Sequence, residues 1–207
     1  MRAWHFTNRT LRDGRPIPPV GEWLTHDGPV GMCQSGLHAS RKALDALQYA
    51  PGDIVHLVEC EDIVEEQGDK FVCRRRKILA SVDATEILRA FARRQALSVI
   101  HLWEAPDVVK RYMETGDESL RAAAWEAARA AAGDAVWGTA RDAAWDAAGD
   151  AAWGTARDAA WHAAGGAARA AAGGTARDAA WHAAWDAANT DLEASLMAAL
   201  GCVPEGE

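Results

Sequence analysis

Residues 125–188 read WEAA RAAA GDAV WGTA RDAA WDAA GDAA WGTA RDAA WHAA GGAA RAAA GGTA RDAA WHAA WDAA, sixteen consecutive tetrads. The fourth position is nearly always Ala, and the first position alternates among Trp, Arg and Gly. Ala is the strongest helix former, and the β-branched residues that favour strands are scarce here. The tetrads therefore predict helix almost throughout.

One straight helix could not bury all seven tryptophans of these tetrads. A residue that recurs every fourth position moves about 40° around a 3.6-residue helix at each tetrad, so the indole stripe reaches the opposite side within about five tetrads. We therefore expect several short helices in an irregular bundle or array. Ala lets their axes approach closely, and Trp fills the space between neighbours.

Glycines are the expected breaks between these helices. The sequence Gly-Thr-Ala-Arg-Asp occurs three times. In each copy the Thr side chain can cap a helix, and the Asp three residues later can accept a hydrogen bond from the backbone N–H of that Thr. The predicted caps are Thr139, Thr155 and Thr175, and the predicted breaks lie near Gly133, Gly138, Gly149, Gly154, Gly165 and Gly173. In the alternative arrangement the glycines stay inside longer helices, at about 1 kcal/mol each.

The composition of the 207 residues is that of a globular protein, with 49% hydrophobic and 25% charged residues. A net charge of −8 argues against general nucleic-acid binding. The four cysteines form no Cys-x-x-Cys pair, and no apolar run is long enough to span a membrane. We expect a cytoplasmic protein with free thiols, no membrane association and no metal.

Residues 1–83 are expected to form an α+β module. Alternating and apolar stretches predict mostly antiparallel strands at 1–7, 22–25, 36–40, 53–59 and 70–82. Ser40 is expected to cap a helix over 41–49, and the acidic segment 61–69 is expected to be a turn.

Residues 84–200 are expected to form an all-α domain rich in Ala and Trp. Apolar residues at helical spacing predict an amphipathic helix over 86–103, and a second helix is expected over 108–114. Thr115-Gly-Asp117 breaks the chain before the tetrads begin. Residues 201–207 are expected to be a short frayed tail.

Two resemblances cover most of the chain. With Cys33-x-x-Gly36-Leu-His-Ala-Ser40, then Leu44, Tyr49 and Asp69-Lys70, the first part resembles an N-terminal domain of unknown function in phage and prophage proteins. The second part runs from Leu102-Trp-Glu-Ala-Pro through Thr115-Gly-Asp-Glu-Ser-Leu into the tetrads, and it looks like a family of putative immunity proteins of bacteria and phages. These resemblances imply a phage accessory, counter-defence or immunity-like role.

A third similarity concerns chemistry. His5 in a first strand, then Gly36-Leu-His-Ala-Ser40, then a helix that reaches Tyr49 is similar to the layout of ADP-ribosyltransferases. The similarity implies NAD as cofactor, held by His5, Ser40 and Tyr49, with Glu59 stabilising the oxocarbenium-like centre, although Glu61 and Glu65 are also eligible. In the alternative, His5 and His38 make ordinary strand hydrogen bonds and Tyr49 lies at the edge of the core.

The run Arg74-Arg-Arg-Lys77 could clamp phosphates through guanidinium forks. Alternate residues of a strand point to opposite faces, so only two members would share a surface. Ion pairing with the acidic segment 61–69 is the favoured interpretation.

In the tetrads, Arg precedes Trp by four residues three times, which places both side chains on one helix face. The predicted ligand-binding residues are Arg141, Trp145, Arg157, Trp161, Arg177 and Trp181. They could line a groove for a nucleotide-like ligand or a protein partner, but packing between helices is favoured for most of the indoles. His162 and His182 are expected at exposed positions rather than as metal ligands.

Together these observations predict a two-part α+β protein with a non-catalytic binding or interaction role. Its partner would be a protein or a small nucleotide-like ligand, and no cofactor is expected. The alternative is an NAD-dependent ADP-ribosyltransferase in the N-terminal module. The tetrads supply neither a nucleophile with its base nor a phosphate-binding loop.

Overall fold

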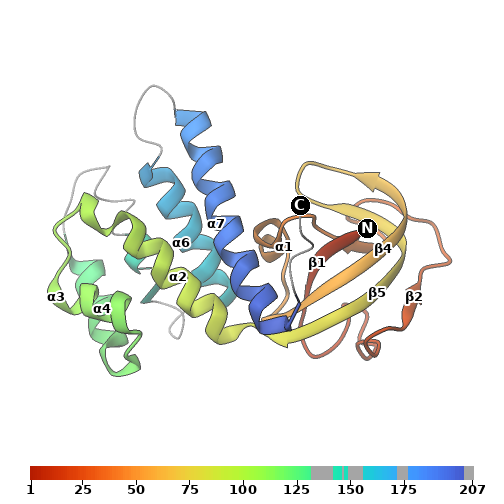
Figure 1. Cartoon of the computed structure of the whole chain (residues 1–207), viewed down its shortest axis with the longest axis horizontal. Helices are drawn as coiled ribbons and strands as arrows, with labels where there is room; N and C mark the ends of the chain where they lie inside the picture. The colour runs from red at the N-terminus through yellow and green to blue at the C-terminus, as the bar shows by residue number, and fades with distance from the viewer. Residues whose placement is uncertain (132–141, 146, 149–155, 172–176, 203–207) are drawn as a thin grey trace. The chain divides into compact units, whose positions relative to one another are not determined.

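The computed structural model describes residues 1–131, 142–145, 147–148, 156–171 and 177–202, with the backbone alone at 156–160, 170–171 and 177–178. The chain forms two compact units (Figure 1). One unit is Met1–Ala84 with Glu193–Glu207, and the other is Thr85–Leu192. The fold is α+β, as predicted: an antiparallel sheet is followed by a helical region.

The first unit contains a five-stranded antiparallel sheet. Its strands are β1 (Arg2–Thr7), β2 (Trp23–Thr25), β3 (Leu37–Ala39), β4 (Ile54–Glu66) and β5 (Phe71–Asp83). The strand order is β1-β4-β5-β2. β3 pairs with the same edge of β5 as β2 does: β2 lies beside residues 75–77 of β5, and β3 lies beside residues 71–73. Figure 1 shows the long strands β4 and β5 curving beside β1.

A backbone bridge closes the strands into a ring. Ser40, directly after β3, exchanges two main-chain hydrogen bonds with Trp4 of β1, of 2.8 and 3.0 Å. β3 is therefore bonded to β5 through Leu37–Ala39 and to β1 through Ser40. With the β1–β4 and β4–β5 ladders, this completes a ring β1-β4-β5-β3-β1. We call this arrangement the strand ring.

The side chains of β1 point alternately to the two faces of the sheet, and both faces are apolar. Ala3 belongs to a buried cluster with Val58, Cys60 and Ile78, whereas Trp4 and Phe6 are buried on the other face. The helix α1 (Ala43–Gln48) packs against β1. The Glu193 carboxylate accepts the Ala43 backbone N–H at 2.9 Å, which satisfies one donor of the first helical turn.

The second unit is built from α2 (Thr85–Val99), the 3-10 turn η1 (Ile100–Leu102), α3 (Asp107–Thr115), α4 (Glu118–Ala130), α6 (Ala156–Ala171) and the first part of α7 (Arg177–Leu200). Residues 142–145 and 147–148 are helical as well. α2 packs against α6 and α3, and α3 packs against α4. Gly116 ends α3 in a left-handed conformation (φ +64°) that suits glycine, and Asp117 caps α4 by accepting the Ser119 N–H at 2.9 Å.

Five indoles of the helical unit contact one another, both between helices and within α7. Trp125 of α4 stacks on Trp145 with ring centroids 6.0 Å apart. Trp161 of α6 meets Trp185 of α7 edge-on at 4.9 Å, and Trp181 stacks on Trp185 at 5.2 Å. Small residues fill the remaining space, because many alanines of these helices are buried. Offset and edge-on aromatic pairs of this kind add about 0.5–1.5 kcal/mol beyond burial.

Two sequence predictions about the local structure of the first unit are wrong. Ser40 does not cap α1, because Lys42 occupies the cap position without a side-chain bond and Ser40 pairs with β1 instead. The acidic segment 61–69 is not all turn, because β4 continues to Glu66 and the chain reverses at Gln67–Lys70. Two ion pairs offset the negative charge of this strand: Glu61 faces Arg75 of β5, and Glu66 pairs with Arg41.

The expected break at Gly165 is also wrong, because α6 runs through both Gly165 and Gly166. A Cβ on Gly166 would lie 3.1 Å from the Ala143 Cβ and 3.3 Å from its backbone. This glycine therefore permits close helix packing rather than a break.

Several other predictions fall outside the described residues: the breaks near Gly133, Gly138, Gly149, Gly154 and Gly173, and the caps Thr139, Thr155 and Thr175. No helix in the described part of the chain is long and apolar enough to cross a membrane.

Candidate functional site

A small cavity lies inside the strand ring. Its polar lining consists of His5 and Thr7 from β1, His56 from β4 and Arg76 from β5. Its apolar lining consists of Leu11, Ile17, Pro18, Leu24 and Ile78. The cavity measures about 10 Å³, which is the room needed by one water molecule. Three cationic or basic side chains thus meet in a largely enclosed space.

His56 is fixed by two hydroxyl groups. Its Nε2 lies 2.8 Å from the Thr7 Oγ1, and its Nδ1 lies 2.7 Å from the Ser81 Oγ. A neutral imidazole offers one donor and one acceptor, and a hydroxyl can play either part, so both contacts suit the neutral ring. Burial, followed by the charge of Arg76, lowers the pKa of His56 to about 4. His56 is therefore neutral at physiological pH.

Arg76 is buried, with 7% of its surface exposed. Its Nη1 donates a hydrogen bond of 2.6 Å to the main-chain carbonyl oxygen of His38. No carboxylate of the described residues pairs with this guanidinium. Burial lowers the pKa of Arg76, and only the thiols of Cys60 and Cys73 oppose that effect. A buried cation normally has an anionic partner, because removing an ion from water costs several kcal/mol.

His5 and His38 add to the basic character of the ring. The His5 and His56 rings stack with centroids 6.2 Å apart. Burial and the neighbouring Arg76 lower the pKa of His5 well below its ordinary value. Burial likewise lowers the pKa of His38, whose Nε2 accepts the Cys33 N–H at 3.0 Å. The cavity thus holds one permanent positive charge and two imidazoles that burial, followed by the charge of Arg76, keeps neutral.

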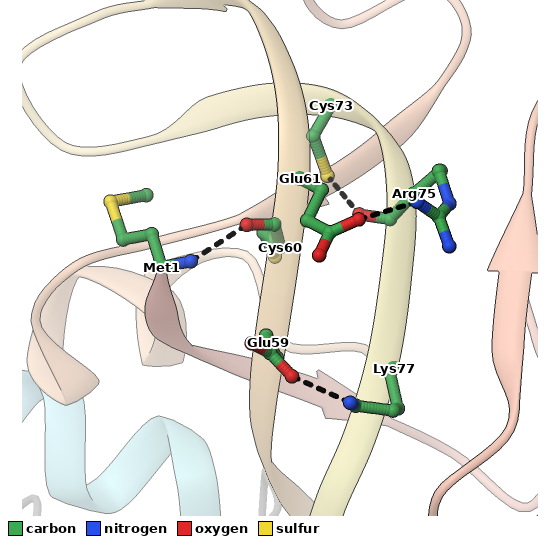
Figure 2. Close-up of polar contacts among 7 residues, drawn as sticks. All are labelled: Met1, Glu59, Cys60, Glu61, Cys73, Arg75 and Lys77. Atoms are coloured by element: carbon green, nitrogen blue, oxygen red, sulfur yellow. Dashed lines mark hydrogen bonds and ion pairs between the residues drawn. The ribbon is translucent and has the colours of Figure 1, made fainter.

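The run 74–77 divides between two faces, as alternation predicts. Figure 2 shows Arg75 and Lys77, which lie on one of these faces, with their partners Glu61 and Glu59. On one face Arg75 pairs with Glu61 at 2.5 Å and Lys77 pairs with Glu59 at 2.6 Å. Both cations also lie over the Trp23 ring, at 4.4 and 4.6 Å from its centroid. Arg76 points into the cavity instead. The favoured interpretation, pairing with the acidic segment, holds for Arg75 but leaves Arg76 without such a partner.

The four residues of the transferase similarity have separate neighbours. His5 lines the cavity, and Ser40 is buried with its backbone bonded to Trp4. Tyr49 is 46% exposed, donates its hydroxyl to Asp69 and lies under the Lys70 ammonium. Glu59 is held by Lys77 on the face with Trp23. Only His5 of these four lines the cavity.

The predicted ligand-binding residues of the helical unit are partly described. Trp145, Trp161 and Trp181 are half-buried, and each contacts another indole. Arg141 and the side chains of Arg157 and Arg177 lie outside the described part.

Other predictions for the helical unit concern its cations and histidines. A cation does stack on an indole, because Arg129 lies 5.4 Å from the Trp125 ring centroid, but there Arg follows Trp by four residues. His162 and His182 are exposed, as predicted.

Sequence reasoning missed His56 and the special position of Arg76. One available signal was a histidine inside the apolar run Ile54-Val-His-Leu-Val58. Among the described residues, no three His, Cys, Asp or Glu side chains gather where they could hold a metal ion.

Residues 1–90 match a family model described as Domain of unknown function (DUF7666). The match includes the whole of β1–β5 and therefore every residue of the cavity. No curated protein and no solved structure matches the chain.

Proposed function

We propose that the chain is a non-catalytic binding protein that takes a small anionic, nucleotide-like ligand in the cavity of the strand ring. The observation that carries the proposal is Arg76, buried to 7% exposure without a carboxylate partner and directed into a cavity. A guanidinium binds phosphate and carboxylate oxygens with two parallel N–H donors. One Arg76 nitrogen is engaged by the His38 carbonyl, so the others are suited to an anion.

The ligand must displace part of the chain, because the cavity has room for one water molecule only. The segment to move is the hairpin 10–16 with Ile17 and Pro18. Its backbone hydrogen bonds join residues of the hairpin to one another, such as the Leu11 N–H to the Arg15 carbonyl at 2.9 Å. Leu11, Ile17 and Pro18 cover the cavity with apolar contacts. Segments held by few buried contacts open at low free energy.

Isothermal titration calorimetry with inorganic phosphate and AMP tests the proposal. The Arg76→Met variant should bind at least about tenfold more weakly, because it loses a charge-assisted pair. Arg75→Met is the matched control, since it removes the same charge from the opposite face and should bind as the wild type does. Near-ultraviolet circular dichroism establishes that both variants fold. Equal affinity of Arg76→Met and wild type would refute the proposal.

One observation favours the transferase alternative: His5 does line the cavity. The cavity lining contains no carboxylate to stabilise a cationic transition state, which supports binding over group transfer. Incubation with NAD decides between them. Release of nicotinamide by the wild type and its loss in His5→Ala would establish the enzyme.

We also propose that the protein acts in the cytoplasm as a phage accessory, counter-defence or immunity-like factor. The sequence resemblances alone support this setting. A protein partner, recovered in stoichiometric amount when the tagged chain is purified from its own host, would support it. Recovery of the chain by itself would count against an immunity-like pairing.

A further inference from the structure

The charges that surround the cavity indicate which anions it can neutralise. Arg76 supplies one positive charge, and each of the two imidazoles can supply another on taking a proton. A monoanion such as a phosphodiester is balanced by Arg76 alone. A dianion such as a phosphate monoester leaves one negative charge to be balanced.

We propose that the cavity takes the terminal phosphate of a monoester, and that its binding adds one proton from solvent to the His5–His56 pair. The inference rests on the proposed function and specifies the ligand and its regulation. Stacked at 6.2 Å, the two rings share the space beside Arg76, so one added proton serves the site. A second would place like charges side by side.

Every group that faces the two imidazoles is compatible with this coupling. Arg76 from β5 acts on both rings, and His38 from β3 acts on His5. The Thr7 and Ser81 hydroxyls on His56 can accept from a charged ring as readily as they serve a neutral one.

The covering elements are neutral at the cavity, because the hairpin segment contributes Leu11, Ile17 and Pro18 and β2 contributes Leu24. With the cavity empty, burial and then the field of Arg76 keep the rings uncharged. A bound dianion reverses the sign of that field and favours the imidazolium.

The experiment measures proton uptake by calorimetry at pH 6 in two buffers of different ionisation enthalpy. Sulfate is the first probe, because it stays a dianion at this pH and any proton taken up must reside on the protein. AMP is the second probe, and dimethyl phosphate is the monoanionic comparison. The wild type should take up close to one proton with sulfate. With AMP the net uptake should be about half a proton, because about half of its phosphate is protonated at pH 6 and releases that proton on binding as the dianion. Dimethyl phosphate should bind at least about tenfold more weakly than AMP, and its binding should take up no proton.

The variants His5→Gln and His56→Gln should bind sulfate more weakly and with reduced proton uptake. If the fully buried His56 cannot be replaced without unfolding the protein, His5→Gln alone is the test of proton uptake. His101→Gln is the control, because His101 is exposed.

Sulfate binding that depends on Arg76 but takes up no proton would overturn this inference and leave the proposed function intact. Equal affinity for dimethyl phosphate and AMP would overturn the assignment to monoesters. Absence of any Arg76-dependent anion binding would overturn both proposals.

Discussion

Replacing His56 by Gln should flatten the dependence of stability on pH. The pKa of His56 is about 4 in the folded chain and 6.5 without the fold. Each pKa unit corresponds to about 1.4 kcal/mol, so the neutral ring contributes roughly 3 kcal/mol of stability above the unfolded pKa. Because the folded pKa is lowered, the unfolded chain takes up the proton first. This contribution is lost as pH falls from about 7 to 4.

Urea unfolding at pH 7.5 and pH 4.5 measures the effect. Between these values the wild type should lose about 2–3 kcal/mol more unfolding free energy than His56→Gln. The carboxylates with lowered pKa, among them Asp13, Glu66 and Asp117, contribute at lower pH and are common to both proteins. Equal losses in the two proteins would refute the idea that His56 is buried in neutral form beside Arg76.

Two further perturbations test the helical unit. Gly166→Ala should destabilise the protein by about 1–3 kcal/mol, because its Cβ would approach Ala143 to 3.1 Å. The matched control is Gly165→Ala, which should stabilise the protein by up to about 1 kcal/mol, because the added Cβ meets only the flexible Arg169 guanidinium at 3.5 Å. Equal effects of the two substitutions on thermal unfolding would contradict the packing of Gly166 against Ala143. Asp117→Ala should cost about 1 kcal/mol by removing the cap of α4, whereas Asp117→Asn should retain most of the stability in the same assay.

The strands and the fold class follow from local sequence patterns, which is why they could be predicted. In β1 the side chain of Ala3 points to one face of the sheet and those of Trp4 and Phe6 point to the other, and α3 ends at Gly116, which Asp117 follows. These signals depend on residues a few positions apart, and β1 and α3 lie where they indicate.

The cavity could not be predicted in the same way, because it depends on contacts between distant strands. His56 meets Thr7 across 49 positions and Ser81 across 25. In the run 74–77, alternation alone shows that Arg75 and Arg76 face opposite ways, but not which face carries the acidic partners. The closure of β3 onto β1 through Ser40 encloses one face, and that pairing has no local signal. The break predicted at Gly165 failed for a related reason, since tertiary packing overrode helix propensity.

The most direct test of the central claim is a crystal structure of the chain soaked with sulfate. We expect a tetrahedral anion within hydrogen-bonding distance of the Arg76 guanidinium, with Leu11 and the hairpin 10–16 displaced from the cavity. A cavity that keeps its hairpin closed and holds only a water molecule, at sulfate concentrations that saturate binding in solution, would contradict it.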